Sequence, residues 1–469
     1  MIVTVIVLAF AALQVAAFYC AWRAVKSSRT PQGAVGWVVF LLSAPYIGVL
    51  LYLFLGHHRY RGYAISRKSS ERVIGGLRDL AAEHAPATQP RIDPTPFERI
   101  AELPAVRGNA LIPLIDGSAS FDAIFAAIDA AERYVLVQFF IVHEDDLGRV
   151  FRDRLVAAAK RGVTVRFMAD AVGSKSLPDA YLDALREAGV KVADPSQGRR
   201  PRQRFQINYR NHRKTVVVDG QLGFTGGLNV GDEYMGRDPT FGPWRDTHLE
   251  MHGPVVLQLQ LIFTEDWHWA TGETLSHDIN WQVHTAEADT TALVVPTGPA
   301  DAMETGALFF FAAIAAARER VWIASPYCVP DTDILTALKH AALAGRDVRL
   351  LVPEVIDHQI PWLAAFAYFD ELREAGVQIW RYQRGFMHQK VVLVDDALAA
   401  IGTTNLDNRS FRLNFEAMVV GFDDGFARSV ETFLTEDFAN ATLLEKTISE
   451  QPARVRYGAP VARLFAPLL

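Results

Sequence analysis

Two long apolar runs without a charged residue open the chain, from Ile2 to Trp22 and from Gly33 to Gly56. A helix needs roughly 20 residues to cross the hydrocarbon core of a bilayer, and both runs are that long. A cleaved signal peptide is the alternative for the first run, but no basic residue precedes it and no clear cleavage site follows it. Two such runs in succession favour a transmembrane hairpin over residues 1–60, and Pro45 in the second run is tolerated in membrane helices.

Basic residues are more numerous after the second run than between the two runs. The connecting loop carries Arg23, Lys26 and Arg29, and the following segment carries Arg59, Arg61, Arg67, Lys68 and Arg72. The side with more Lys and Arg faces the cytoplasm in most membrane proteins. We therefore predict a multi-pass protein of the cell membrane with the domains that follow the hairpin in the cytoplasm.

Beyond the apolar runs, the chain alternates between strand and helix patterns. Residues 61–105 contain several prolines and are predicted to form a linker. Ser120 is a candidate N-cap for a helix that runs to Arg133, and the nearly continuous apolar run from Tyr134 to Val142 is typical of a buried strand. A second such run covers Val163 to Ala169. This alternation predicts an α/β fold with helices on the faces of a sheet.

The second part of the chain repeats the first. The segment from Tyr181 to Val190 matches the segment from Tyr368 to Val377 almost residue by residue, which indicates an internal duplication. We predict two similar α/β domains, residues 106–275 and 276–469, in a pseudo-twofold arrangement.

The first half carries 11 additional residues after its copy of this segment. They include Arg199, Arg200, Arg202 and Arg204. These arginines form either a solvated basic loop or a rim that attracts anionic lipid head groups.

Each half also contains the pattern H-x-K-x4-D, followed by an asparagine 17 positions after the histidine. One short motif carries a risk of chance occurrence. Two copies with the same asparagine spacing indicate a single site built from both halves. The members are His212, Lys214, Asp219 and Asn229 in the first half, and His388, Lys390, Asp395 and Asn405 in the second.

These residue types can break a phosphodiester without a metal. One neutral histidine attacks phosphorus, and the other, protonated, supplies a proton to the leaving alcohol. The two lysines and two asparagines offset charge on the phosphoryl oxygens. Lysine and histidine two positions apart on a strand face the same way, whereas Asp219 and Asp395 lie at odd spacing and are interpreted as turn-forming or orienting residues. No cluster of carboxylates converges on the motifs, so we predict no metal and no other cofactor.

Each histidine needs an acceptor on its second ring nitrogen to set its tautomer. Asp246 and Glu416 follow their histidines by 34 and 28 residues and are the candidates. Because the halves are expected to meet at the site, the carboxylate of one half can orient the histidine of the other.

Composition narrows the possible partners. The net charge is −6, which gives no basic field for nucleic acid. The two cysteines, Cys20 and Cys328, exclude a disulfide framework and a cysteine-rich zinc site.

The motifs resemble the phospholipase D superfamily, whose hallmark is a duplicated H-x-K-x4-D. The segments 210–234 and 241–248 are similar to the first motif region of bacterial cardiolipin synthases, and 386–390 with 405–416 to their second. The N-terminal hairpin and the final residues 463–469 are similar as well. This resemblance places Asp219 and Asp395 among the active-site residues and makes His212 the usual nucleophile, although the symmetric motifs themselves do not choose.

The resemblance implies transfer of a phosphatidyl group between two phosphatidylglycerol molecules, with anionic membrane lipids as partners and glycerol as the second product. A membrane-bound hydrolase of the phospholipase D or nuclease type would use the same residues with water. A transferase that uses a different alcohol, such as serine, and an inactive membrane scaffold are also compatible with the sequence. No oligomeric state follows from the sequence.

Overall fold

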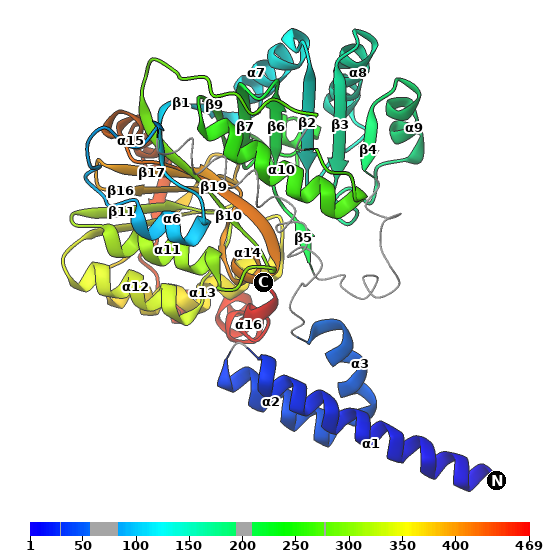
Figure 1. Ribbon diagram of the computed structural model, residues 1–469. Coiled ribbons are helices and arrows are strands. Elements are labelled where there is room, and N and C mark those ends of the chain that lie inside the picture. The colour runs from blue at the N-terminus through cyan, green and yellow to red at the C-terminus, as the bar shows by residue number, and fades with distance from the viewer. Residues whose placement is uncertain (29, 57–82, 194–208, 276–277) are drawn as a thin grey trace. The chain divides into compact units, whose positions relative to one another are not determined.

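The computed structural model describes residues 1–28, 30–56, 83–193, 209–275 and 278–469 (Figure 1). The chain forms two compact units, one of Met1–Arg61 with Gln197–Tyr209 and one of Gly62–Ser196 with Arg210–Leu469. The predicted arginine rim at Arg199, Arg200, Arg202 and Arg204 lies outside the described residues, as do residues 276–277 at the predicted domain boundary.

The first unit contains the two apolar runs. The first run forms α1 (Ile2–Ser27), which is long and apolar enough to cross a membrane. The second run was expected to form one helix, and this prediction is wrong: it forms α2 (Pro31–Ser43) and α3 (Pro45–Leu55). Pro45 has no backbone N–H to continue the ladder, and Ala44 before it leaves the helical region, with φ −136° and ψ 62°.

Small residues of α1 let these helices pack closely. Ala17, Cys20, Ala21 and Ala24 are buried in one cluster with Leu41, Val49 and Tyr52. Short side chains at a helix contact allow close approach of the backbones, as in membrane helix pairs.

The second unit is built on one mixed sheet of 16 strands among the described residues. The first half supplies β1 (Val106–Ile115), β2 (Tyr134–Phe139), β3 (Thr164–Ala169), β4 (Lys191–Ala193), β6 (Thr215–Val218), β7 (Leu222–Gly226) and β9 (Thr247–His252). The second half supplies β10 (Thr290–Thr297), β11 (Arg320–Ala324), β13 (Asp347–Pro353), β14 (Gln378–Tyr382), β16 (Val391–Val394), β17 (Leu398–Gly402), β19 (Asn414–Gly421) and β20 (Ala441–Leu443). The short β5 (Arg210–Asn211) pairs with β19 beside this path.

The strand order is the same in both halves. From the middle outward, the first half runs β1-β9-β7-β6-β2-β3-β4 and the second runs β10-β19-β17-β16-β11-β13-β14. In each half the four inner pairings are antiparallel and the outer two are parallel. The duplication read from the sequence is therefore a duplication of topology.

The halves join through β1 and β10, which pair antiparallel. Val106 lies opposite Ala292 and Asn109 opposite Thr290, with an irregularity between them. The buried Asn109 amide donates to the carbonyls of Val106 and Thr290 at 2.7 and 2.9 Å, which satisfies backbone groups at this irregularity.

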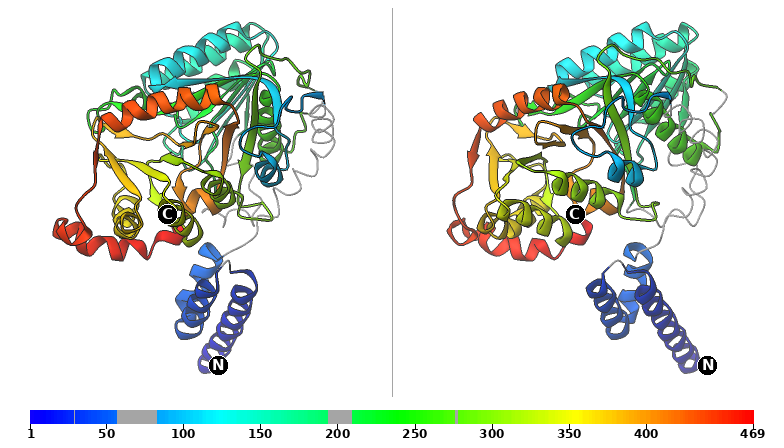
Figure 2. Two further views of the ribbon diagram at one scale, coloured as in Figure 1. Left: turned by 90° about the vertical axis from the view of Figure 1, so that its left-hand side faces the viewer. Right: turned by 60° about the vertical axis from the view of Figure 1, so that its left-hand side comes forward.

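Helices cover both faces of the sheet (Figure 2). Successive residues of a strand point to opposite faces of the sheet and so belong to different hydrophobic layers. Val135 and Val216 pack under the helices of one face, whereas Leu136 and Val217 pack under α10 on the other. In the first half, one face carries α7 (Asp116–Ala130), α8 (Asp146–Lys160) and α9 (Asp179–Glu187), and the other face carries α10 (Val255–Thr271). In the second half, one face carries α11 (Thr305–Ala316), α12 (Thr332–Leu343) and α13 (Gln359–Glu374), and the other face carries α15 (Asp424–Ala439).

Two predicted boundaries need correction. Helix α7 begins at Asp116, so Ser120 is an internal residue whose hydroxyl donates to the Asp116 carbonyl rather than an N-cap. Strand β2 ends at Phe139, because the last residues of the apolar run turn away: Val142 forms a bridge with Val230. Apolar composition alone does not distinguish the end of a strand from a buried loop.

The end of the predicted linker is folded. It contains α6 (Thr95–Ala101), whose Phe97 and Ile100 are buried in the core of the second half. Pro94 and Pro96 lie at the start of this helix, where a missing N–H costs nothing. The remaining short elements are β8 (Trp244–Arg245), β12 (Cys328–Val329), β15 (Phe386–Met387), β18 (Leu406–Asp407), α14 (Asn408–Arg412), α16 (Ala453–Arg463) and the 3-10 turns η1 (Asp232–Met235), η2 (Ile448–Glu450) and η3 (Ala466–Leu468).

Candidate active site

Each histidine of the repeated motif is held by the backbone of the opposite half. Strand β5, just before His212, pairs with β19, and the His212 N–H donates to the Phe415 carbonyl at 2.9 Å. Strand β15, just before His388, pairs with β8, and the His388 N–H donates to the Arg245 carbonyl at 2.8 Å. The two motifs are thereby brought to one place by reciprocal strand pairing.

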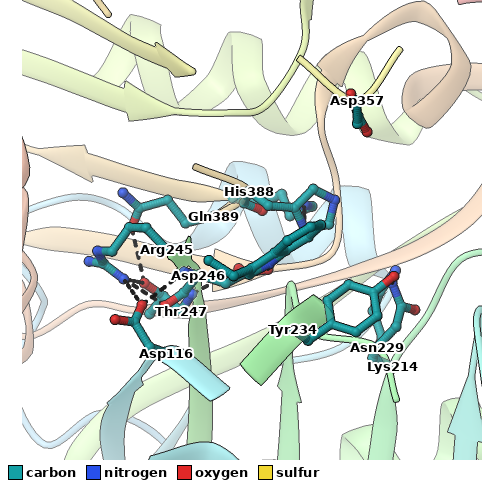
Figure 3. A network of polar contacts seen from close by, with 12 residues as sticks. Asp116, Lys214, Asn229, Tyr234, Arg245, Asp246, Thr247, Asp357, His388 and Gln389 are labelled. Carbon is teal, nitrogen blue, oxygen red and sulfur yellow. Dashed lines mark hydrogen bonds and ion pairs between the residues drawn. The ribbon is translucent and has the colours of Figure 1, made fainter. Parts of the chain in front are cut away.

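The same pairing delivers the carboxylates. Glu416 follows Phe415 on β19 and accepts from His212 Nδ1 at 2.8 Å. Asp246 follows β8 and accepts from His388 Nδ1 at 2.8 Å (Figure 3). Both carboxylates are fully buried, and each orients the histidine of the other half, as the sequence suggested. With Nδ1 donating to a carboxylate, each neutral ring carries its lone pair on Nε2.

Burial governs the charge of both rings. It lowers the pKa of His212, and Lys214 and Lys390 act in the same direction against the opposing Glu416. It lowers the pKa of His388 further, with contributions from Lys390, Lys214 and His212. Because residues of both motifs act on each histidine, the two rings belong to a single electrostatic site.

The pKa values of the two orienting carboxylates shift in opposite directions. Burial raises the pKa of Glu416, but His212 and Lys214 outweigh it, and the net shift is downward. Burial raises the pKa of Asp246, and Lys390 only partly offsets this. Glu416 also accepts from Ser410 Oγ and Asn414 Nδ2, both at 3.0 Å, so the carboxylate of the His212 pair is the better stabilised anion.

The two lysines lie beside their histidines but not on a strand. Residues 212–214 precede β6, and the sequence-based placement of His212 and Lys214 within a strand is wrong. The Lys214 ammonium donates to the His212 carbonyl at 2.8 Å, and Lys390 donates to the His388 carbonyl. Burial lowers the pKa of Lys214 to about 7 and that of Lys390 to about 8.

The two asparagines are not equivalent. The Asn229 amide is occupied, because its oxygen accepts from the Ile141 N–H and its nitrogen donates to the Tyr234 hydroxyl, both at 3.1 Å (Figure 3). Asn405 is also buried, but its amide oxygen has no hydrogen-bond partner among the described residues, and the same holds for the neighbouring Thr404 hydroxyl. The asparagine amide oxygen is thus engaged in the first half and lacks a partner among the described residues in the second.

Asp219 and Asp395 lie away from the histidines, at the opposite end of the strand that follows each motif. The Asp219 carboxylate accepts from the N–H groups of Glu132, Arg133 and Tyr134, all within 2.9 Å. Asp395 accepts from the N–H groups of residues 318–320 in the same way. Both have positive φ, 55° and 50°, which matches the turn-forming interpretation, and the catalytic role implied by the resemblance stays a prediction.

The middle residues of the motifs, which sequence reasoning passed over, anchor them to helices. Arg213 donates to Asp266 on α10 at 2.7 Å and to the Glu416 carbonyl at 2.9 Å. Gln389 donates to Asp437 on α15 at 2.8 Å. Arg245 grips the same Asp437 with two hydrogen bonds of 2.7 Å. An acid recurs near the C-terminal end of α10 and of α15, and this recurrence was the signal that could have identified Asp266 and Asp437.

The surroundings of the two histidines differ. The Phe140 ring meets the His212 ring edge-on, with centroids 4.8 Å apart. Near His388 lies the carboxylate of Asp357 (Figure 3), whose charge partly opposes the lowering of the His388 pKa. This carboxylate accepts a hydrogen bond from the Tyr327 hydroxyl. The offset of 187 residues between Tyr181 and Tyr368 pairs Asp357 with Asp170, in the corresponding loop between β3 and α9 of the first half, and this correspondence was the signal that could have identified it.

No group of three or more His, Cys, Asp or Glu among the described residues is arranged to hold a metal ion. Cys20 and Cys328 are buried and free, so neither is part of a disulfide.

Comparisons with known proteins agree with this geometry. The family described as "Cardiolipin synthase, PLD-like domain" matches residues 124–240 and 310–438, and a phospholipase D-nuclease N-terminal family matches residues 15–57. Cardiolipin synthase A of Pseudomonas aeruginosa (strain LESB58) is 45% identical over 97% of this chain and 95% of its own length. Cardiolipin synthase A of Pseudomonas fluorescens is 44% identical over 95% of each chain.

Among solved structures, phosphatidylserine synthase of Haemophilus influenzae superposes with a TM-score of 0.59 at 13% identity, covering 80% of this chain and 99% of that one. This likeness is one of fold. Fold and paired motifs together define a phospholipase D-like enzyme. At the level of sequence the chain belongs to the cardiolipin synthase family.

We expect the crossed carboxylates to be needed for turnover. Glu416→Gln and Asp246→Asn each remove the charge that fixes one imidazole, and turnover should fall on the order of 10²–10⁴-fold, as when the acid of a catalytic triad becomes an amide. Steady-state rates of the purified variants measure this loss.

Glu250→Gln is the matched control, because Glu250 forms a similar 2.8 Å contact with His252 on the partly exposed part of β9. It should keep native turnover. Folded Glu416→Gln and Asp246→Asn proteins that stayed within a few-fold of native turnover would remove the proposed role of the crossed pairs.

Proposed function

We propose that this enzyme transfers a phosphatidyl group from one phosphatidylglycerol to a second, forming cardiolipin and glycerol through a phosphohistidine intermediate. The observation that carries the proposal is the pair of buried imidazoles, each oriented by a carboxylate of the opposite half and flanked by a buried lysine. The names of the curated relatives supply the direction of the reaction.

We further propose that the halves are related by a pseudo-twofold axis through the β1–β10 pairing. The identical strand order and the reciprocal pairs β5–β19 and β15–β8 support this arrangement. In it neither half alone holds a complete histidine–carboxylate pair, so activity requires both.

The reaction proceeds in two displacements. In the first, Nε2 of one histidine attacks phosphorus, the bond from phosphorus to the glycerol oxygen breaks, and the other histidine gives that oxygen a proton. In the second, the hydroxyl of another phosphatidylglycerol attacks phosphorus, the phosphorus–nitrogen bond breaks, and the second histidine takes back the proton. One phosphodiester replaces another, so no energy source is consumed.

The lysines bind the phosphodiester anion. Because burial has lowered the pKa of Lys214 to about 7 and that of Lys390 to about 8, an anion placed between them favours their charged forms. The anion likewise favours protonation of the histidine that serves as acid. Asn229 supports the site through Tyr234, and the buried Asn405 amide oxygen has no partner among the described residues.

We assign His212 as the nucleophile and His388 as the acid and base. Glu416, held as an anion, stabilises the positive charge that forms on a phosphorylated His212. Burial and Lys390 lower the pKa of His388, and Asp357 only partly opposes this shift, so the substrate anion is what favours its protonation. The usual assignment in relatives agrees with this choice.

A hydrolase of the phospholipase D type is the second candidate, since water would use the same groups. The similarity to curated cardiolipin synthases over nearly the whole chain favours the transferase.

Purified full-length protein given radiolabelled phosphatidylglycerol should form labelled cardiolipin and free glycerol. Addition of EDTA should leave the rate unchanged, because histidines and lysines supply the chemistry. Lipid chromatography identifies the products.

Phosphatidic acid as the sole lipid product would establish the hydrolase instead. Phosphatidylserine formed only when serine is added would establish a different acceptor. Activity lost in EDTA and restored by Mg²⁺ would contradict the metal-free mechanism.

The nucleophile can be identified with a substrate whose leaving group needs no acid, phosphatidyl-p-nitrophenol. His388→Gln should release one equivalent of nitrophenolate per site in a burst and then stall, with the phosphatidyl group on His212 by mass spectrometry. His212→Gln should show no burst. The opposite pattern would reverse the assignment, and two burstless variants would argue against a covalent intermediate.

We also propose a multi-pass membrane topology with the catalytic unit in the cytoplasm. Helix α1 provides one crossing, and α2 with α3, interrupted at Pro45, provides the return. A C-terminal tag should resist protease in intact spheroplasts and be digested in inverted vesicles, because the basic excess favours a cytoplasmic C-terminal side. Digestion in intact spheroplasts would reverse the orientation.

A further inference from the structure

The last helix of the chain presents an apolar stripe and several arginines to the outside of the catalytic unit. We propose that this face of α16 docks on the surface of an anionic lipid bilayer and holds the active site next to its substrates. The inference builds on the proposed function, because the substrates named there are anionic lipids.

Two opposite stripes run along α16 and the residues after it. Val455, Ala459, Ala462 and Ala466 recur at helical spacing and are buried. Tyr457, Val461 and Leu464 recur at the same spacing and are exposed by 66%, 59% and 78%, and Phe465 beside them is exposed by 48%. A helix packed on the protein through one stripe has no need of a second apolar stripe on its solvent side.

The charged side chains of the segment that carries the exposed stripe are all arginines. Arg454, Arg456 and Arg463 are exposed on α16, and no Asp or Glu occurs between Gln451 and Leu469. The nearest acid before them, Glu450, is engaged by the N–H and hydroxyl of Thr447. Aromatic and aliphatic side chains flanked by arginines are the composition of a helix that lies in the interface of an anionic membrane.

The stripe is connected to the active site through the end of the chain. Helix α16 packs along α13, where Gly458 faces Leu363, and continues into η3. The guanidinium of Arg409 donates to the Leu468 carbonyl at 3.0 Å. The next residue, Ser410, donates to Glu416, the carboxylate that orients His212. Docking of α16 would therefore fix the position of the site relative to the bilayer.

The charge distribution favours a lipid surface over a second copy of the chain. In a twofold contact between two α16 faces, the arginines of one copy would face those of the other, and α16 itself offers no acid to pair with them. An anionic lipid surface neutralises them and accepts the apolar side chains at the same time.

The test measures the polarity around a fluorescent probe on α16 and does not depend on enzyme turnover. Full-length Leu464→Cys, labelled with the fluorophore NBD and reconstituted in vesicles, should show blue-shifted emission and quenching by lipids that carry a spin label near the head group. The shift should be larger in phosphatidylcholine vesicles that contain phosphatidylglycerol than in those without it. The native cysteines are buried, and the native chain treated identically gives the background.

Val150→Cys is the matched control, because Val150 is an exposed apolar residue on α8 in the first half, at the other end of the unit in Figure 1. Its probe should keep the emission of a probe in water. Combining Leu464→Cys with Arg454→Gln and Arg456→Gln should abolish the dependence on phosphatidylglycerol.

Three outcomes would overturn the proposal: a water-like emission from the probe at 464, a blue shift without quenching that is lost on dilution, or equal quenching at 464 and 150. The second outcome would identify a contact between copies. A failure to form cardiolipin with a quenched probe at 464 would reject the proposed function and leave the docking surface intact.

Discussion

The structure depends on a pair of hydrogen bonds that cross between its halves, from His212 to Glu416 and from His388 to Asp246. Each bond needs a backbone pairing to bring its partners together, β5 with β19 and β15 with β8. The continuous sheet, joined at β1 and β10, is the frame that makes both pairings possible at once. Reactive groups are thus positioned by short strands that would have no partner in an isolated half.

So many buried charges in one place are costly unless each is paired. Two buried arginines are paired with acids on the covering helices, Arg213 with Asp266 on α10 and Arg245 with Asp437 on α15. Within the described part of the chain the two lysines form no ion pair with a carboxylate, and burial shifts their pKa values towards neutrality instead. The site therefore holds two cations that are easily discharged, which suits it to receive an anion rather than to pair internally.

Much of this arrangement could be predicted from the sequence, and the failures have physical causes. The duplicated motif and the spacing of Asp246 and Glu416 predicted the crossed pairs, because each histidine needs a carboxylate acceptor for its second ring nitrogen. The α/β fold followed from alternating apolar patterns. The break at Pro45 was missed because hydropathy does not register a lost hydrogen bond, and the end of β2 was missed because a buried loop is as apolar as a strand. Asp357 was missed because a loop has no apolar periodicity, although the internal duplication places Asp170 at the same point of the first half.

Asp219 and Asp395 show how a recurring motif can combine two kinds of constraint. Each carboxylate gathers three backbone N–H groups where the chain reverses direction with positive φ, at the far end of the strand from the histidine. The Asp of the motif therefore shapes a turn, while the His and Lys lie together at the candidate active site. Loss of turnover on changing either aspartate would therefore not distinguish a displaced strand from a lost reagent.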